Sequence, residues 1–132
     1  MAIIDHPADI DGRFSVLTAT GILPALIAGL DGRGFRAGAA VVLDAALAAP
    51  TTVDCAPAVG AAVSVGLLRE HRLATTVLMP YDEALAGFAL WFRQLWAESL
   101  GKGGDGTTPA AAMGVTDQHS QLQLYQIGRA HV

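Results

Sequence analysis

The chain has 132 residues, of which 52% are hydrophobic and 15% are charged, and its formal net charge is −4. Typical globular domains carry roughly 25% charged residues, so much of this surface is expected to be covered by parts of a larger protein. The acidic balance and the single lysine, Lys102, argue against nucleic-acid binding, which needs a basic face. One cysteine, Cys55, cannot form an internal disulfide, which suits a reducing cytosol.

The predicted elements begin with the short apolar run at residues 2–4, which is typical of the end of a parallel strand. A loop follows, and then a helix is predicted to begin near Ser15, whose hydroxyl can cap free amides. Pro24 is expected to kink this helix or to begin a new turn. The remaining elements of this half are a turn, an alanine-rich helix, a linker and an apolar helix, at 31–34, 35–48, 50–57 and 58–71.

The second half of the chain contains the clearest strand. Residues 75–79 are short, apolar and β-branched, which predicts a buried parallel strand closed by Pro80. A helix, a flexible glycine-rich loop and the start of a last helix are predicted at 82–99, 101–108 and 118–125. This order of strands and helices indicates an α/β fold. Two strands alone would not hold a sheet, so further strands are expected from missing parts.

A glutamine and a glutamate stand four residues apart in the helix predicted at 82–99. Gln94 and Glu98 therefore project from one face of that helix. Glu98 lies in the last turn, where the helix dipole disfavours a charged carboxylate, and such a group is a candidate general base near neutral pH. By spacing alone, a solvated glutamate at a helix end is the commoner interpretation.

Three motifs reverse that interpretation. Residues 91–102, WFRQLWAESLGK, resemble the second signature region of the glucose-6-phosphate isomerase (phosphoglucose isomerase) family. Residues 9–17, DIDGRFSVL, resemble the family's Gly-Gly-Arg-(Phe/Tyr)-Ser region, and residues 117–122, DQHSQL, resemble its Gln-His segment. The three occur in the order that the family requires. Two intervening stretches also resemble bacterial members, at 75–81 and 104–109.

The resemblance implies a fold and an activity. The fold is an incomplete three-layer αβα sugar isomerase domain (SIS-type, Rossmann-like), with few parallel strands and many helices. The activity is the interconversion of glucose 6-phosphate and fructose 6-phosphate through a cis-enediolate, without a cofactor. The implied protein is a cytoplasmic homodimer that binds a small sugar phosphate and neither nucleic acid nor membrane. The four histidines are scattered without metal-ligand spacing, so no metal site is predicted.

The resemblance also assigns roles to individual residues. Glu98 matches the family's base, and Gln94 matches a substrate-binding glutamine. Arg13 matches an arginine whose permanent charge stabilises developing negative charge without competing for the proton. Gly12 stands beside it in the substrate-binding segment. His119 matches the histidine associated with ring opening, which reaches the active site of the neighbouring subunit in family members.

Two departures from the family pattern are visible. Asp11 stands where the family usually has the first of two glycines. Aspartate tolerates positive φ better than most residues, should that position require it, but its carboxylate can pair with Arg13. The family's phosphate-binding loop and its late lysine are expected before Met1 and after Tyr125. Residues 1–125 are therefore expected to be an interior fragment that is inactive by itself.

The last seven residues, 126–132, are expected to be non-native. They back-translate to CAG ATC GGA AGA GCA CAC GTC, which after its first base matches a widely used sequencing adaptor. The hypothesis is that the reading frame ran into library sequence at the end of a DNA fragment.

Other interpretations remain open. A non-catalytic, SIS-type regulatory module that binds sugar phosphate would need the phosphate loop but no proton shuttle, so Gln94, Glu98 and His119 together favour the enzyme. A small membrane-associated protein is suggested by the uncharged stretch 14–30, but its proline and glycine argue against a spanning helix. Fusion of the parent isomerase to a transaldolase is a further possibility.

Overall fold

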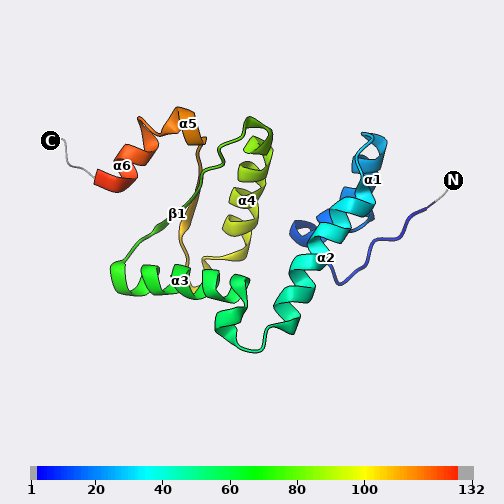
Figure 1. The fold of residues 1–132 in the computed structure, drawn as a ribbon, viewed down its shortest axis with the longest axis horizontal. Helices are drawn as coiled ribbons and strands as arrows, with labels where there is room; N and C mark the ends of the chain where they lie inside the picture. Colours follow the sequence, from blue (N-terminus) through cyan, green and yellow to red (C-terminus); the bar gives the residue numbers. More distant parts are fainter. Residues whose placement is uncertain (1–2, 128–132) are drawn as a thin grey trace. The chain divides into compact units, whose positions relative to one another are not determined.

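The computed structural model describes residues 3–127, which fall into two compact units (Figure 1). The first unit is Met1–Gly66 and the second is Leu67–Val132. The helix-rich content and a parallel strand pair confirm the α/β class.

The first unit is helical. Its elements are the 3-10 helix η1, the α-helices α1 and α2, the 3-10 helix η2 and most of α3, at Gly12–Leu17, Ala19–Ile27, Gly32–Ala48, Thr52–Asp54 and Ala56–His71. The strand predicted at residues 2–4 is wrong: Ile3 and Ile4 lie in no regular element, and Ala2 is outside the described residues. A strand needs a neighbour to bond its backbone, and residues 3–127 provide none for this segment.

The first long helix begins later than the sequence predicted. Ser15 lies inside η1, where its hydroxyl donates to the carbonyl oxygen of Gly12 at 2.6 Å. The N-cap of α1 is Thr18, whose hydroxyl oxygen accepts a hydrogen bond from the amide of Thr20 at 3.3 Å. The uncharged stretch 14–30 is thereby divided between η1 and α1, which contains Pro24. None of the helices within residues 3–127 combines the length and apolar character needed to cross a bilayer.

Helix α2 begins inside the predicted turn. The carboxylate of Asp31 accepts hydrogen bonds from the amides of Arg33 and Gly34, at 3.1 and 2.9 Å. These bonds satisfy two of the amides that a helix start leaves free, so the helix extends back to Gly32.

The second unit is built around two parallel strands. Strand β1 is Thr75–Leu78 and β2 is Thr108–Ala111, in a register that pairs Thr75 with Thr108 and Leu78 with Ala111. Between and after them lie η3, α4, η4, α5 and α6, at Glu83–Leu85, Ala86–Ser99, Lys102–Gly104, Gly114–Asp117 and Gln121–Ile127. The sequence prediction missed β2 because Pro109 lacks an amide proton and alanine is a poor strand former.

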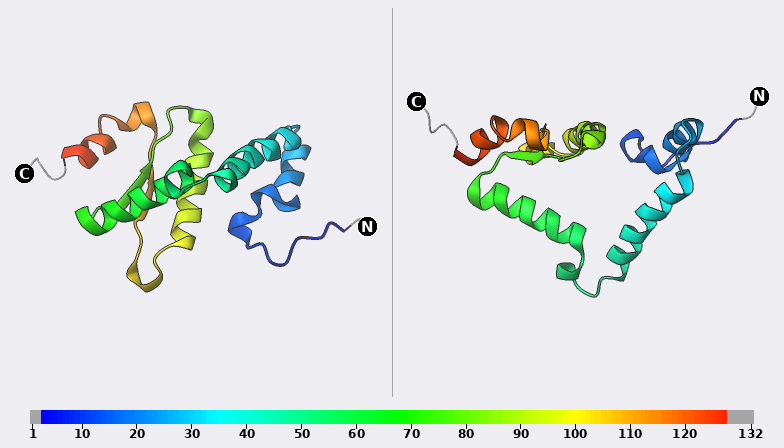
Figure 2. Two further views of the ribbon diagram at one scale, coloured as in Figure 1. Left: turned by 60° about the horizontal axis from the view of Figure 1, so that its bottom comes forward. Right: turned by 45° about the horizontal axis from the view of Figure 1, so that its top comes forward.

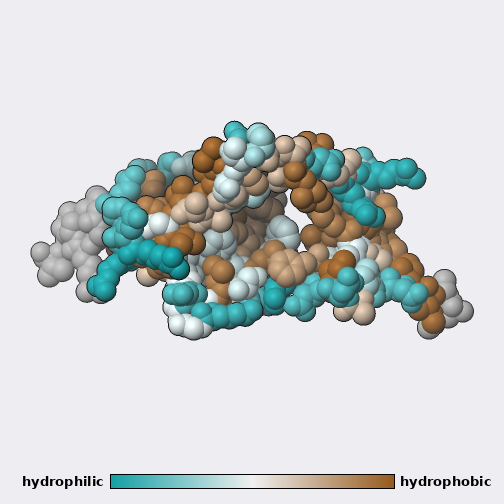
Figure 3. Space-filling view, turned by 90° about the horizontal axis from the view of Figure 1, so that it is seen from below, coloured by the Kyte–Doolittle hydropathy of each residue, from teal (hydrophilic) through white to brown (hydrophobic). Residues whose placement is uncertain are grey.

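Helix α4 connects the two strands and packs against β2 (Figures 1 and 2). The apolar side chains buried within the described residues are Ala89 on α4 and Ala112 just after β2. Large apolar side chains are otherwise widely exposed, and the surface shows broad hydrophobic areas (Figure 3). Of the tail predicted to be non-native, Gln126 and Ile127 continue α6, and residues 128–132 lie outside the described residues.

Candidate active site

Helix α4 presents Glu98 in its last turn, as predicted. The helix follows η3, where the carboxylate of Asp82 accepts a hydrogen bond from the amide of Ala84 at 2.9 Å. The helix stops at Ser99, and Gly101 has the left-handed φ of +95° that commonly terminates helices.

Gln94 and Glu98 form a direct pair on the exposed side of α4. The amide Nε2 of Gln94 donates a hydrogen bond to Oε1 of Glu98 at 3.0 Å. This contact confirms that the two side chains share one helix face. Within the described part of the chain, Gln94 is the one residue that hydrogen-bonds this carboxylate. An amide holds the carboxylate without competing for its proton, so the pair can both fix the orientation of an acid group and leave it able to exchange protons.

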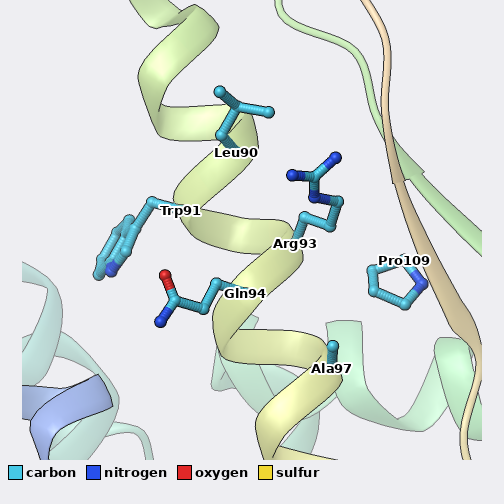
Figure 4. A pocket seen from close by; sticks show the side chains of 6 residues that line it. All are labelled: Leu90, Trp91, Arg93, Gln94, Ala97 and Pro109. Carbon is cyan, nitrogen blue, oxygen red and sulfur yellow. The ribbon is translucent and has the colours of Figure 1, made fainter.

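An open pocket of about 740 Å³ lies against this part of α4 (Figure 4). It is lined by Leu90, Trp91, Arg93, Gln94, Ala97 and Pro109. Trp91 and Gln94 project to one side of the helix, whereas Arg93 and Ala97 project toward Pro109 of β2. Its volume lies within the roughly 300–1,000 Å³ typical of small-molecule sites. Sequence reasoning did not single out Arg93, although it directly precedes Gln94 in the matched segment.

Arg13 lies in the first unit, within η1, and is held by its neighbours. Its guanidinium Nη2 lies 3.2 Å from Oδ2 of Asp11, and its Cζ lies 5.0 Å from the centroid of the Phe14 ring. Its Nε is buried without a hydrogen-bond partner in the described part of the chain. The ion pair confirms that Asp11 can engage Arg13.

The backbone at Asp11 and Gly12 does not demand glycine. Asp11 has a φ of −61°, an ordinary extended conformation, so the conditional expectation of positive φ does not apply here. A Cβ built on Gly12 meets nothing within 4 Å. Gly12 therefore leaves open space beside Arg13 rather than relieving backbone strain.

His119 is exposed in the turn between α5 and α6. Its neighbour Gln118 donates a hydrogen bond from Nε2 to the hydroxyl of Tyr81 at 2.8 Å. The last turn of α4 lies by the amino end of β2, and the turn between α5 and α6 lies beyond its carboxyl end (Figure 1). The turn that carries His119 and the last turn of α4 therefore lie at opposite ends of β2.

The structure therefore joins two of the predicted residues, Gln94 and Glu98. Arg13 and Gly12 belong to the other unit. Residues 3–127 contain no group of three or more His, Cys, Asp or Glu side chains arranged to hold a metal ion.

Glu98 itself does not line the open pocket, but its partner Gln94 does. A strand–helix–strand unit with this glutamine–glutamate pair defines part of an α/β enzyme with a candidate proton-transfer site. The family model for phosphoglucose isomerase matches residues 2–126. The chain belongs to the phosphoglucose isomerase family.

Curated relatives agree with this assignment. The chain is 48% identical over 122 residues to a probable glucose-6-phosphate isomerase of Haloarcula marismortui, covering 92% of this chain and 27% of the relative. It is 47% identical over 128 residues to the glucose-6-phosphate isomerase of Rubrobacter xylanophilus, covering 97% and 29%. The crystal structure of a hypothetical protein from Thermus thermophilus matches with a TM-score of 0.80 at 37% identity, covering 93% and 30%. The chain thus spans less than a third of the length of these proteins.

Proposed function

We propose that the protein from which this segment derives interconverts glucose 6-phosphate and fructose 6-phosphate. The observation that carries the proposal is the hydrogen bond from Gln94, which lines the open pocket, to Glu98, in a chain of the phosphoglucose isomerase family. The substrate is a small sugar phosphate, and the enzyme is a cytoplasmic isomerase of glycolysis and gluconeogenesis with the SIS-type fold.

In the proposed step, the carboxylate of Glu98 takes the proton from C2 of the open-chain aldose. The electron pair of the broken C–H bond forms the C1–C2 double bond, and the carbonyl oxygen gains the negative charge of the cis-enediolate. The proton of the C2 hydroxyl moves to the C1 oxygen, which leaves the negative charge on the C2 oxygen. The protonated Glu98 then gives its proton to C1, the C1–C2 double bond is consumed, and the C2 oxygen becomes the carbonyl oxygen of the ketose. Gln94 holds the carboxylate and contacts the substrate. Arg13 stabilises the enediolate because its charge persists at any working pH.

His119 is proposed to act in ring opening at the active site of a neighbouring subunit. Imidazole suits this role because its ordinary pKa lies near neutrality. The His119 turn and the last turn of α4 lie at opposite ends of β2, an arrangement that fits a homodimer in which His119 serves the neighbouring subunit.

Residues 1–125 are proposed to be an interior fragment of that isomerase, inactive when isolated, with residues 126–132 as a non-native tail. Support comes from the share of the relatives that the chain covers and from its exposed apolar side chains. In genomic DNA, the isomerase reading frame should continue both upstream of codon 1 and downstream of codon 125. The downstream codons should differ from those that encode residues 126–132 here. Native codons at those positions, or isomerase turnover by the purified chain, would contradict the proposal.

A graft tests the proposed function in a complete enzyme. Residues 5–125 replace the matching segment of the Rubrobacter xylanophilus isomerase, and this protein is called the grafted isomerase below. Exchange of the substrate's C2 hydrogen with solvent is measured by NMR. The Glu98→Gln variant should lose roughly 10²-fold or more of this exchange while substrate binding largely survives. Glu83→Gln, which removes an acid from η3, is the matched control and should retain exchange. Full exchange in Glu98→Gln would instead favour a non-catalytic sugar-phosphate-binding module.

A further inference from the structure

A side-chain hydrogen-bond network ties the last turns of α4 to β1 and to Thr107, the residue just before β2. The indole Nε1 of Trp96 donates to the hydroxyl oxygen of Thr107 at 2.9 Å. That oxygen lies 2.6 Å from the hydroxyl oxygen of Thr76 on β1. All three side chains are partly buried. Since the indole can only donate and each hydroxyl can donate and accept, the three groups satisfy one another.

The network sets the rotation of α4 about its own axis. Successive residues of an α-helix are turned by roughly 100° about the helix axis. Residues two positions before and two positions after Trp96 are therefore each roughly 160° from it, and both lie on the opposite face of the helix. These residues are Gln94 and Glu98, and both are exposed. Ala89, seven residues before Trp96 and thus close to its direction, is buried. Holding Trp96 toward the strands therefore directs Gln94 and Glu98 away from them.

We propose that Thr107 and Trp96 are positioning residues for Glu98. Thr107 acts through the indole of Trp96. The hydrogen bond between them fixes the last turns of α4 relative to β1 and β2, and this determines the position of the Glu98 carboxylate. Neither residue contacts the substrate. The inference rests on the proposed role of Glu98 as the base.

The test uses the grafted isomerase and compares kcat with KM. Thr107→Val keeps the shape of the side chain but removes both hydrogen bonds, and it should lower kcat roughly 10- to 100-fold with KM changed less than about twofold, because small misplacements of a catalytic group cost about this much. Thr107→Ser keeps the hydroxyl and should restore most of kcat. Thr108→Val, at the adjacent exposed residue of β2, is the matched control and should leave kcat unchanged.

A second route does not depend on the folding of the Thr107 variant. Trp96→Phe retains a ring that can pack on Phe92, whose centroid lies 5.2 Å from that of Trp96, but lacks the N–H donor. It should reproduce most of the loss of kcat, and the double variant should lose no more than Thr107→Val alone, because that variant already lacks the bond from the indole.

The outcomes separate this inference from the proposed function. A grafted isomerase in which Glu98→Gln abolishes exchange, but Thr107→Val and Trp96→Phe keep full kcat, would overturn the positioning role alone. Equal losses in Thr107→Ser and Thr107→Val would also overturn it. Full exchange in Glu98→Gln would instead remove the proposed function, whatever the Thr107 variants do.

Discussion

The carboxylate of Asp11 lies 3.2 Å from the guanidinium of Arg13, at the position where the resemblance described above led us to expect glycine. The Asp11 side chain is 66% exposed and that of Arg13 is 26% exposed. Water screens such a pair, so its contribution is small, but it places a negative charge beside the group proposed to stabilise the enediolate.

Replacing Asp11 by glycine should free Arg13 for the substrate. In the grafted isomerase, Asp11→Gly is expected to raise kcat/KM by about 1.4- to fivefold, which corresponds to the roughly 0.2–1 kcal/mol of an exposed ion pair. The gain should shrink at high salt, because salt already weakens the pair. Asp9→Gly removes the same charge two residues away and serves as the control. A fall in kcat/KM for Asp11→Gly would show that Asp11 assists Arg13 instead.

Gly114 is expected to tolerate no side chain. A Cβ at this buried position would meet the ring of Tyr81 at 2.5 Å, and the amide of Gly114 donates to the carbonyl oxygen of Pro80 at 2.7 Å. Gly114→Ala should lower the free energy of unfolding by about 1–3 kcal/mol, measured by urea unfolding of the grafted isomerase. Gly87→Ala, in α4 with nothing within 4 Å, should be neutral or stabilising by up to about 1 kcal/mol. Equal stability of the two variants would contradict the predicted clash.

Asp31 should stabilise α2 through its two capping hydrogen bonds. Asp31→Ala is expected to cost about 1 kcal/mol of unfolding free energy, whereas Asp31→Ser should retain most of it. Asp44→Ala removes an acid from the interior of the same helix and controls for the change of charge. Circular dichroism during urea unfolding measures all three, and an Asp31→Ala midpoint equal to that of the unsubstituted chain would disprove the cap.

The isolated chain should associate with itself. Its exposed large side chains include Ile27 at 79%, Leu47 at 76% and Val53 at 80% exposure, and apolar areas of this kind are rarely left open in soluble monomers. Light scattering should report a mass well above 13.6 kDa, and the dye ANS should fluoresce on binding. A monodisperse monomer that does not bind ANS would argue against the fragment proposal.

The helices could be predicted from sequence more fully than the strands. The helices expected at 35–48 and 58–71 correspond to α2 and α3, and the strand expected at 75–79 corresponds to β1. Periodicity and glycine or proline signals are local, so they serve for such elements. Strand β2 depends on a partner 33 residues away and has unfavourable residues, so it is determined by pairing that no local pattern reveals.

The candidate site shows the same division. The common face of Gln94 and Glu98 follows from their spacing, and the pairing of Asp11 with Arg13 follows from their proximity in sequence. The bonds from Thr107 to Trp96 and to Thr76 span 11 and 31 residues. They depend on how the strands and α4 assemble, so the sequence alone did not indicate them.

The β1–α4–β2 unit has one genetic consequence. The glutamate, its amide partner and the threonines and tryptophan that orient their helix are all encoded within residues 75–111. A hybrid gene made by recombination with breakpoints outside this interval would receive Glu98 together with the residues that orient its helix. A breakpoint between codons 98 and 107 would separate them, and the resulting hybrid would keep the acid while risking loss of the hydroxyl that orients it.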